Sequence, residues 1–151
     1  MKNSDDVNVQ GKVALVTGAA RGLGRACTLA LAEAGADIAL GLRDVNADNG
    51  LAKEVEALGR KALPLQMDVS KMEEIEAAFR KIKEYYERLD IVVNNAGVAP
   101  ENLIENVTEE DFDYTLAVNL KGTFFISKSA GALMIKQRYG RIINLSSQAG
   151  F

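Results

Sequence analysis

Near its N-terminus the chain reads Thr17-Gly18-Ala19-Ala20-Arg21-Gly22-Leu23-Gly24, directly after a compact apolar run, Val13-Ala14-Leu15-Val16. The residues that follow recur with the spacing of a helix. A strand that leads into a glycine-rich turn and then a helix is the setting that a dinucleotide-phosphate loop requires. Glycine lets a phosphate approach the main chain, and the N-terminus of the helix favours its negative charge. A plain strand–helix turn is the alternative interpretation, and this context makes it the weaker one.

The rest of the chain continues this alternation of strands and helices, which predicts βαβ units and a parallel sheet. The predicted strands are 13–17, 37–42, 62–67, 91–93 and 141–145. The predicted helices begin near residues 23, 51, 70 and 108, and the last runs to about Gln137. Pro64 suits a sheet edge better than its centre. We therefore expect an α/β fold, a Rossmann-like doubly wound parallel sheet of about five strands in the order 3-2-1-4-5, in a single domain over residues 1–151.

Local patterns set the expected faces and ends of the helices. The predicted apolar stripe of the first helix consists of Leu23, Ala26, Cys27, Ala30, Leu31 and Ala34. Within it, Cys27 is expected to be a buried structural thiol rather than a nucleophile. Ser70 and Glu73 have the spacing of a capping box for the third helix. Thr108 and Asp111 mark the expected start of the long fourth helix.

Composition and charge exclude several classes of protein. The net charge of −3 and the lack of a basic stretch argue against nucleic-acid binding. No apolar run approaches the roughly 18 residues of a membrane span. The chain has no histidine, which rules out a Ser-His-Asp mechanism and most zinc sites within it, and we expect no metal site. A single cysteine fits a reducing compartment, so the cytoplasm is the expected location.

Four motifs follow one another along the chain at the ends of predicted strands. They are Thr17 to Gly24, Asp68-Val69, Asn94-Asn95-Ala96-Gly97, and Asn119 followed by Ser146-Ser147. Together they resemble the classical short-chain dehydrogenase/reductase family, over about residues 11–151. The resemblance implies an oxidoreductase that binds a nicotinamide dinucleotide. It also implies a small-molecule substrate, a carbonyl or an alcohol, which the family interconverts by hydride transfer.

The resemblance also implies roles for individual residues. Asn119 would hold a catalytic water through the local helix backbone, and Ser147 would hydrogen-bond the substrate oxygen. Asp68 would contact the adenine edge, although a role at the helix entry beside Ser70 is an equal alternative. Residues 95–97 would line the adenosine ribose, and Asn94 would help to hold the central strands. The residues expected to bind the cofactor are Gly18, Arg21, Gly22, Leu23, Gly24, Arg43, Asp68, Val69, Asn95, Ala96, Gly97 and Val118.

Charge at the end of the second strand bears on which nicotinamide cofactor is bound. In a Rossmann fold an acidic residue there binds the ribose 2′-hydroxyl of NAD, whereas an arginine accommodates the 2′-phosphate of NADP. The position of the NAD-type aspartate is Leu42 in this chain, Arg43 follows it, and Arg21 lies in the glycine loop. These residues favour NADP. The nearby Asp44 keeps NAD as an alternative cofactor. A second alternative is that Arg43 is simply a solvated loop residue with no role in binding.

The family's chemistry also needs a tyrosine as general acid/base and a lysine four residues after it, beyond the serine. No tyrosine of this chain is followed by lysine at that spacing. We therefore expect the cofactor-binding portion of a longer oxidoreductase, inactive by itself. The alternative is a stand-alone, non-catalytic nucleotide-binding or interaction module; coding sequence beyond Phe151 would separate the two. An epimerase or dehydratase of the extended branch is less favoured, because its glycine spacing differs.

The fifth predicted strand is expected to lie at an uncovered edge of the sheet. Its Ile142-Ile143 and the long fourth helix would then expose apolar surface. We therefore expect the chain to self-associate, or to be locally disordered near its C-terminus.

Overall fold

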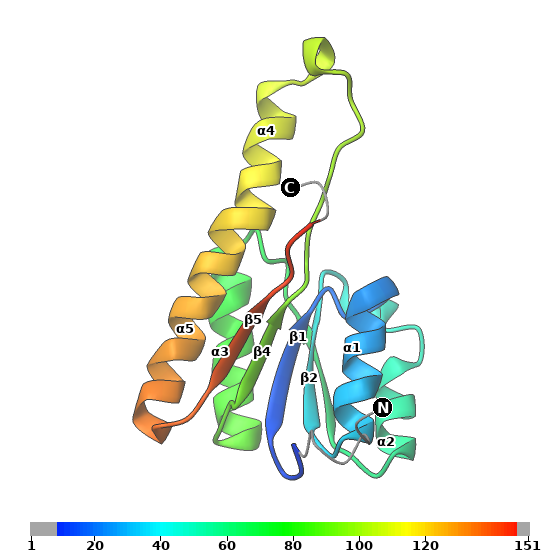
Figure 1. Cartoon of the computed structure of the whole chain (residues 1–151), viewed down its shortest axis with the longest axis vertical. Helices are drawn as coiled ribbons and strands as arrows, with labels where there is room; N and C mark the ends of the chain where they lie inside the picture. Colours follow the sequence, from blue (N-terminus) through cyan, green and yellow to red (C-terminus); the bar gives the residue numbers. More distant parts are fainter. Residues whose placement is uncertain (1–8, 148–151) are drawn as a thin grey trace, which may run out of the picture.

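The computed structural model describes residues 9–147, which form a five-stranded parallel sheet between two layers of helices (Figure 1). The strand order is β3-β2-β1-β4-β5, so the predicted fold class and order are confirmed. The strands are β1 (Val13–Thr17), β2 (Asp37–Leu42), β3 (Ala62–Gln66), β4 (Ile91–Asn94) and β5 (Arg141–Asn144). β3 forms one edge of the sheet, where Pro64 removes no hydrogen bond that a central strand would need.

Helices occupy the connections between the strands. They are α1 (Gly22–Glu33), α2 (Leu51–Ala57), α3 (Met72–Tyr86), α4 (Glu109–Leu116) and α5 (Thr123–Gln137), with short 3₁₀ turns η2 (Val45–Ala47) and η3 (Ile104–Asn106). In Figure 1, α1 and α2 cover one face of the sheet, whereas α3 and α5 cover the other. This arrangement leaves the carboxyl ends of the strands open.

Alternate residues along β1 to β4 supply two separate cores, because successive side chains point to opposite faces of a sheet. Ala14, Val16, Ile38 and Leu40 pack against α1 and α2, together with Leu51 and Val55. Val13, Leu15, Leu65 and Val92 pack against α3 and α5, together with Ile75, Ile82 and Ile126. The strands of the two central pairs are therefore buried on both faces, as their continuous apolar sequence predicts.

The predicted apolar face of α1 is correct for Cys27 and Leu31, which pack against the core, but the fully buried positions lie one residue further along the helix. Its buried positions are Gly24, Thr28 and Ala32, whereas the side chain of Leu23 is 68% exposed. Small residues face the sheet because α1 begins so close to the strand ends that larger side chains would not fit. Cys27 lies at the margin of this face, only partly buried and without a disulfide partner.

The predicted capping box of α3 is also wrong, by one position. The N-cap is Lys71 without a side-chain cap, and the Ser70 hydroxyl instead donates to Asp68 Oδ1 at 2.7 Å. Glu74, rather than Glu73, reaches back over the start of the helix, where its Oε2 accepts from the Asp68 backbone N–H at 2.7 Å. The carboxylate of Glu74 therefore satisfies a backbone donor outside the helix.

The long fourth helix is present, but a π-helical segment, η4 (Ala117–Gly122), divides it into α4 and α5. Its predicted start is confirmed: Thr108 and Asp111 form a reciprocal capping box. Its end at Gln137 is also confirmed, because Arg138 adopts a left-handed conformation that stops the helix. A π turn inside an α-helix widens the backbone locally and often marks a functional position.

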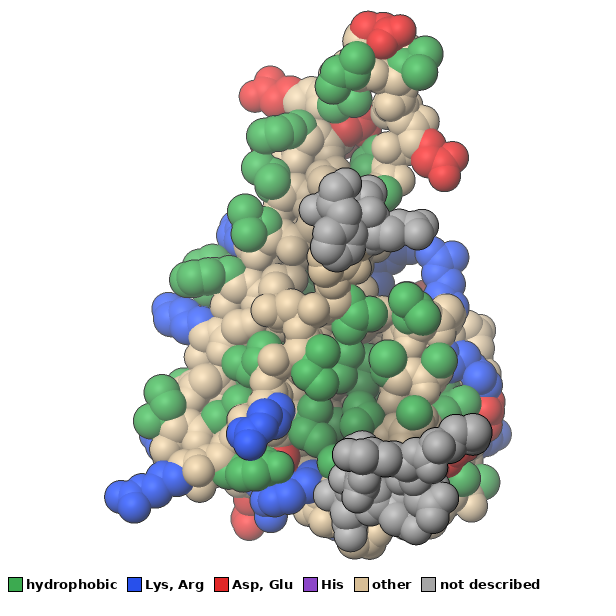
Figure 2. All heavy atoms as spheres, in the orientation of Figure 1, with side chains coloured by type: hydrophobic (Ala, Val, Ile, Leu, Met, Phe, Trp, Pro, Cys, Tyr) green, Lys and Arg blue, Asp and Glu red, His purple; other side chains and the backbone are tan. Residues whose placement is uncertain are grey.

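Apolar side chains remain exposed along this helix and on β5. Figure 2 shows them on the flank formed by α4 and α5; they include Phe112, Leu116, Leu120 and Phe124, which are 58, 41, 64 and 62% exposed. Ile142 and Ile143 on the edge strand β5 are exposed as well. The predicted apolar surface is therefore present. Among residues 9–147, no helix is long and apolar enough to cross a membrane.

Candidate nucleotide-binding site

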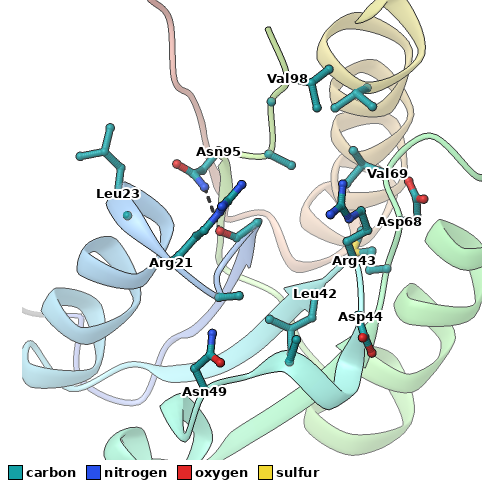
Figure 3. Close-up of a pocket in the computed structure, with 18 of the residues that line it drawn as sticks. Arg21, Leu23, Leu42, Arg43, Asp44, Asn49, Asp68, Val69, Asn95 and Val98 are labelled. Carbon is teal, nitrogen blue, oxygen red and sulfur yellow. Dashed lines mark hydrogen bonds between the residues drawn. The ribbon is translucent and has the colours of Figure 1, made fainter. Parts of the chain in front are cut away.

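A cavity of about 540 Å³ opens at the carboxyl ends of the strands (Figure 3). It lies where β1 pairs with β2 on one side and β4 on the other, the point at which ligands bind in open α/β sheets. Every residue expected to bind the cofactor lines this cavity, except Gly24. The fold therefore brings together four loops that are far apart in the sequence.

The glycine loop forms one wall of the cavity. Gly18 and Gly22 have φ angles of +64° and +55°, a conformation that favours glycine. A Cβ on Gly18 would also approach the Ala96 Cα to 3.1 Å, so the missing side chain lets this loop pack against the loop after β4. Gly24 does not face the cavity because it supports this loop from behind, where a Cβ would collide with the Gly18 carbonyl oxygen.

Thr17 and Asn95 connect the loops after β1 and β4. Thr17 Oγ1 accepts from the backbone N–H groups of Asn95 and Ala96, each at 3.0 Å. In return, Asn95 Nδ2 donates to the carbonyl oxygens of Thr17 and Gly18, at 2.9 and 3.2 Å. Since Thr17 is buried, these bonds replace hydration that its neighbours have lost, and they hold both loops in one arrangement.

Two arginines supply the positive charge of the cavity. Arg21 extends from the glycine loop and Arg43 from the end of β2, toward the same opening (Figure 3). Among residues 9–147, neither guanidinium has a carboxylate partner. Asp44 also lines the cavity, but its Oδ1 caps η2 by accepting from the Asn46 backbone N–H at 3.0 Å. The site therefore has unpaired cationic groups suited to an anion.

The first turn of α1 adds to this character. Its N-cap, Arg21, makes no side-chain cap, and the turn contains no acidic residue. The free N–H groups and the positive end of the helix dipole therefore face the glycine loop without an internal counter-charge.

The opposite wall comes from the loop after β3. Val69 is buried, and Asp68 uses one carboxylate oxygen, Oδ1, for the Ser70 backbone N–H at 3.0 Å and the Ser70 hydroxyl. Asp68 thus orders the turn into α3 while it lines the cavity, so the helix-entry role is present. A contact of Asp68 with adenine stays a prediction.

Asn119 lies beside the cavity in the π-helical segment. Its Oδ1 accepts from the Val98 backbone N–H at 2.9 Å and its Nδ2 donates to the Val98 carbonyl at 2.8 Å. The amide therefore completes the hydrogen bonding of one residue in the loop after β4, and it lies 3.5 Å from the position of a Cβ on Gly97. Ser147 follows β5 and is exposed; neither Asn119 nor Ser147 lines the cavity.

Asn94, in front of this loop, ties three elements together. Its Nδ2 donates to Asn144 Oδ1 on β5 at 2.8 Å and to Ser127 Oγ on α5 at 3.1 Å. The side chain is almost wholly buried, so these bonds hold the β4–β5 pair to the helix layer. Asn94 therefore joins β4 to the edge strand β5 and to α5, and its expected role in holding the central strands stays a prediction.

Other lining residues were not identified from the sequence. Asn49 follows η2 in a left-handed conformation, and Tyr114 reaches the cavity from α4. Neither lies at a strand end or in a glycine motif, so no sequence pattern marks them. Among residues 9–147, no group of three or more Cys, Asp and Glu side chains is placed to hold a metal ion.

The parallel order and the glycine-walled cavity define a Rossmann-type nucleotide-binding protein. The family model described as short chain dehydrogenase matches residues 12–151, and the chain belongs to that family. The resemblance seen in the motifs is thereby confirmed.

Several relatives and solved structures are similar to this chain. A 3-oxoacyl-acyl-carrier-protein reductase, FabG, of Thermotoga maritima is 40% identical over 146 residues, which is 95% of this chain and 58% of that protein. The Escherichia coli FabG is 36% identical over 95% of this chain and 58% of its own length. A crystal structure of a short-chain type dehydrogenase/reductase from Mycobacterium marinum has a TM-score of 0.93 at 32% identity, covering 99% of this chain and 61% of the other. The chain thus spans less than two thirds of these proteins.

Proposed function

We propose that this chain is the NADP(H)-binding portion of an oxidoreductase that interconverts a carbonyl and an alcohol by hydride transfer. The observation that carries the proposal is the pair of guanidiniums of Arg21 and Arg43, which have no carboxylate partner among residues 9–147 and line one cavity whose strand-end position is Leu42 rather than a carboxylate. An arginine at this place accommodates a 2′-phosphate, which an aspartate would repel. NAD is the alternative cofactor.

The residues present fit such a cofactor. The first turn of α1 and the glycine loop before it suit a pyrophosphate, because among residues 9–147 that turn has no side-chain cap for its N–H groups and Gly22 leaves open space where a Cβ would lie. Residues 95–97 form a small-residue wall on which the adenosine ribose fits. Asp68, Val69 and Val118 line the same cavity, and we assign them to the adenine and neighbouring groups of the cofactor. The nicotinamide ring would supply or accept the hydride.

We also assign positions to the reaction centre. Asn119 would hold a water at the widened helix backbone, and Ser147 would donate its hydroxyl to the substrate oxygen. A tyrosine followed four residues later by lysine does not occur in these 151 residues. We therefore expect this chain to bind cofactor without turnover; a purified-protein-dependent oxidation of NADPH with any carbonyl compound would contradict that expectation.

The test is a direct titration of the chain with NADPH and with NADH. We expect NADPH to bind more tightly, and Arg43→Ala to weaken NADPH binding roughly 10- to 100-fold, since a hydrogen-bonded charge contributes about 1.5–3 kcal/mol. NADH binding would change little. Arg80→Ala removes an exposed arginine from α3, away from the cavity, and serves as the control. Tighter binding of NADH, with a ratio that Arg43→Ala leaves unchanged, would overturn the assignment.

Self-association is the second part of the proposal. The exposed side chains of Phe112, Leu116, Leu120 and Phe124 form an apolar surface larger than isolated exposed residues would give. We expect copies of the chain to associate through this flank. The alternative, a stand-alone nucleotide-binding or interaction module, would also bind the cofactor and self-associate. It would differ in having no segment that supplies the catalytic tyrosine and lysine.

A further inference from the structure

The side-chain amide of Gln66 makes three hydrogen bonds just outside the cavity. Its Oε1 accepts from the Val45 backbone N–H at 3.0 Å, and its Nε2 donates to the Arg43 carbonyl at 2.8 Å and to Glu74 Oε2 at 2.9 Å. A flipped amide would place its oxygen against two acceptors, so only one orientation satisfies all three partners. The amide therefore hydrogen-bonds the backbone on both sides of Asp44, at the Arg43 carbonyl and the Val45 N–H.

Gln66 acts where the backbone pairing of β2 and β3 ends. It is the last residue of β3 and lies in register with Leu42, the last residue of β2. One further backbone bond follows, from the Met67 N–H to the Leu42 carbonyl at 2.7 Å. Beyond this bond, the side chain of Gln66 continues the contact between the end of β3 and the segment after β2. Gln66 itself does not line the cavity.

Glu74 extends this connection to the facing wall. Its Oε2, which accepts from Gln66, also accepts from the Asp68 backbone N–H, while its Oε1 lies 3.1 Å from Lys71 Nζ. The Asp68 N–H is the largest cause that holds the pKa of Glu74 below its ordinary value, so the carboxylate is ionised at neutral pH. One oxygen atom thus links the Arg43 loop to the Asp68 loop, and both line the cavity.

We propose that Gln66 is a positioning residue for cofactor choice: it holds the Arg43 backbone so that the guanidinium faces the cavity, and so sets the preference for a 2′-phosphate over a 2′-hydroxyl. This inference rests on the proposed function, which assigns Arg43 to that phosphate. Arg43 has no carboxylate partner among residues 9–147, so the place of its side chain depends on its backbone. If the loop were released, binding would have to order both loop and side chain, which costs affinity.

The experiment measures dissociation constants of the 151-residue chain for NADPH and NADH, together with its thermal midpoint. With Gln66→Ala we expect the constant for NADPH to rise about five- to tenfold and that for NADH to change less than about twofold. A general loss of structure would instead weaken both cofactors and lower the midpoint. The ratio of the two constants therefore separates positioning from folding.

Glu74 provides a second, independent set of variants. Glu74→Ala removes the link and should lower the NADPH preference in the same direction, whereas Glu74→Gln keeps an oxygen for both donors and should retain most of it. Glu73→Ala, at an exposed neighbour on α3, is the matched control. An NADPH preference that survives both Gln66→Ala and Glu74→Ala, or an equal loss for both cofactors, would overturn the inference alone. If the unaltered chain shows no NADPH preference, the proposed function and this inference are both wrong.

Discussion

The side-chain amide of Asn95 lies directly against Gly24, where a Cβ would come within 2.5 Å of Asn95 Nδ2. The same amide bonds the carbonyls of Thr17 and Gly18, so the loop after β4 passes beneath the first turn of α1. Gly24 is the helical residue that permits this approach. The third glycine of the loop therefore serves packing between helix and strand ends rather than contact with a ligand.

Gly24→Ala should disrupt both folding and binding. The added methyl group would displace the Gly18 carbonyl or Asn95, and we expect the free energy of unfolding to fall by about 1–3 kcal/mol. NADPH affinity should fall in parallel. Urea unfolding and titration measure the two effects. Gly131→Ala, inside α5 with open space around it, should instead raise stability by about 0.5–1 kcal/mol. Unchanged unfolding of Gly24→Ala would contradict this account of the loop.

Thr17→Val tests the junction between the two loops. Valine fills the same space but leaves the backbone N–H groups of Asn95 and Ala96 without their acceptor, which should cost about 2–4 kcal/mol of unfolding free energy. Thr28→Val is the control, because Thr28 is equally buried and its hydroxyl only bonds the Gly24 carbonyl within its own helix. Chemical denaturation that shows equal losses for both variants would argue against a special role of Thr17.

Asp90→Asn should lower stability in a pH-dependent manner. Burial raises the pKa of Asp90, but bonds from Arg88 Nε and Nη2 and from the Val13 N–H outweigh it and hold the pKa below its ordinary value. The ionised carboxylate therefore contributes its full stabilisation at pH values above the pKa of aspartate in the unfolded chain, about 3.9. This stabilisation is lost as the pH falls through the lower pKa of Asp90 in the folded protein.

We therefore expect a deficit for Asp90→Asn of about 2–3 kcal/mol at pH 7 that stays constant to about pH 5 and shrinks below about pH 4. Asp113→Asn, at an exposed site on α4, should unfold like the parent chain. A deficit that grows on acidification would reverse the sign of this linkage and refute it.

Leu120→Lys should reduce self-association. A charge in the middle of the exposed flank opposes its burial against another copy. Light scattering over a concentration series should show a lower apparent mass than the parent chain. Ala30→Lys adds the same charge at an exposed position on α1 and should leave the mass unchanged. A parent chain that is already monomeric at all concentrations would remove the basis of this prediction.

Much of the fold was predictable because its signals are local. β1, β4 and β5 end at small polar residues, and the glycine loop, Thr108 with Asp111, and the stop at Gln137 are patterns within a few neighbours. The errors concern packing that depends on contacts between residues far apart in the sequence. Leu23 is apolar and periodic, yet it is exposed, because its neighbour Gly24 is the residue of the first turn of α1 that is buried.

The sequence by itself determined the class of fold and the set of loops at one end of the sheet, since these follow from periodicity and from motifs a few residues long, and the strand order then followed from the order that Rossmann sheets share. Only the tertiary structure decided that Gly24 supports the loop, that Glu74 rather than Glu73 reaches back to Asp68, and that Gln66 holds Arg43. Those relationships join residues 6 to 71 positions apart, and their geometry depends on how the strands register and how closely the helices pack.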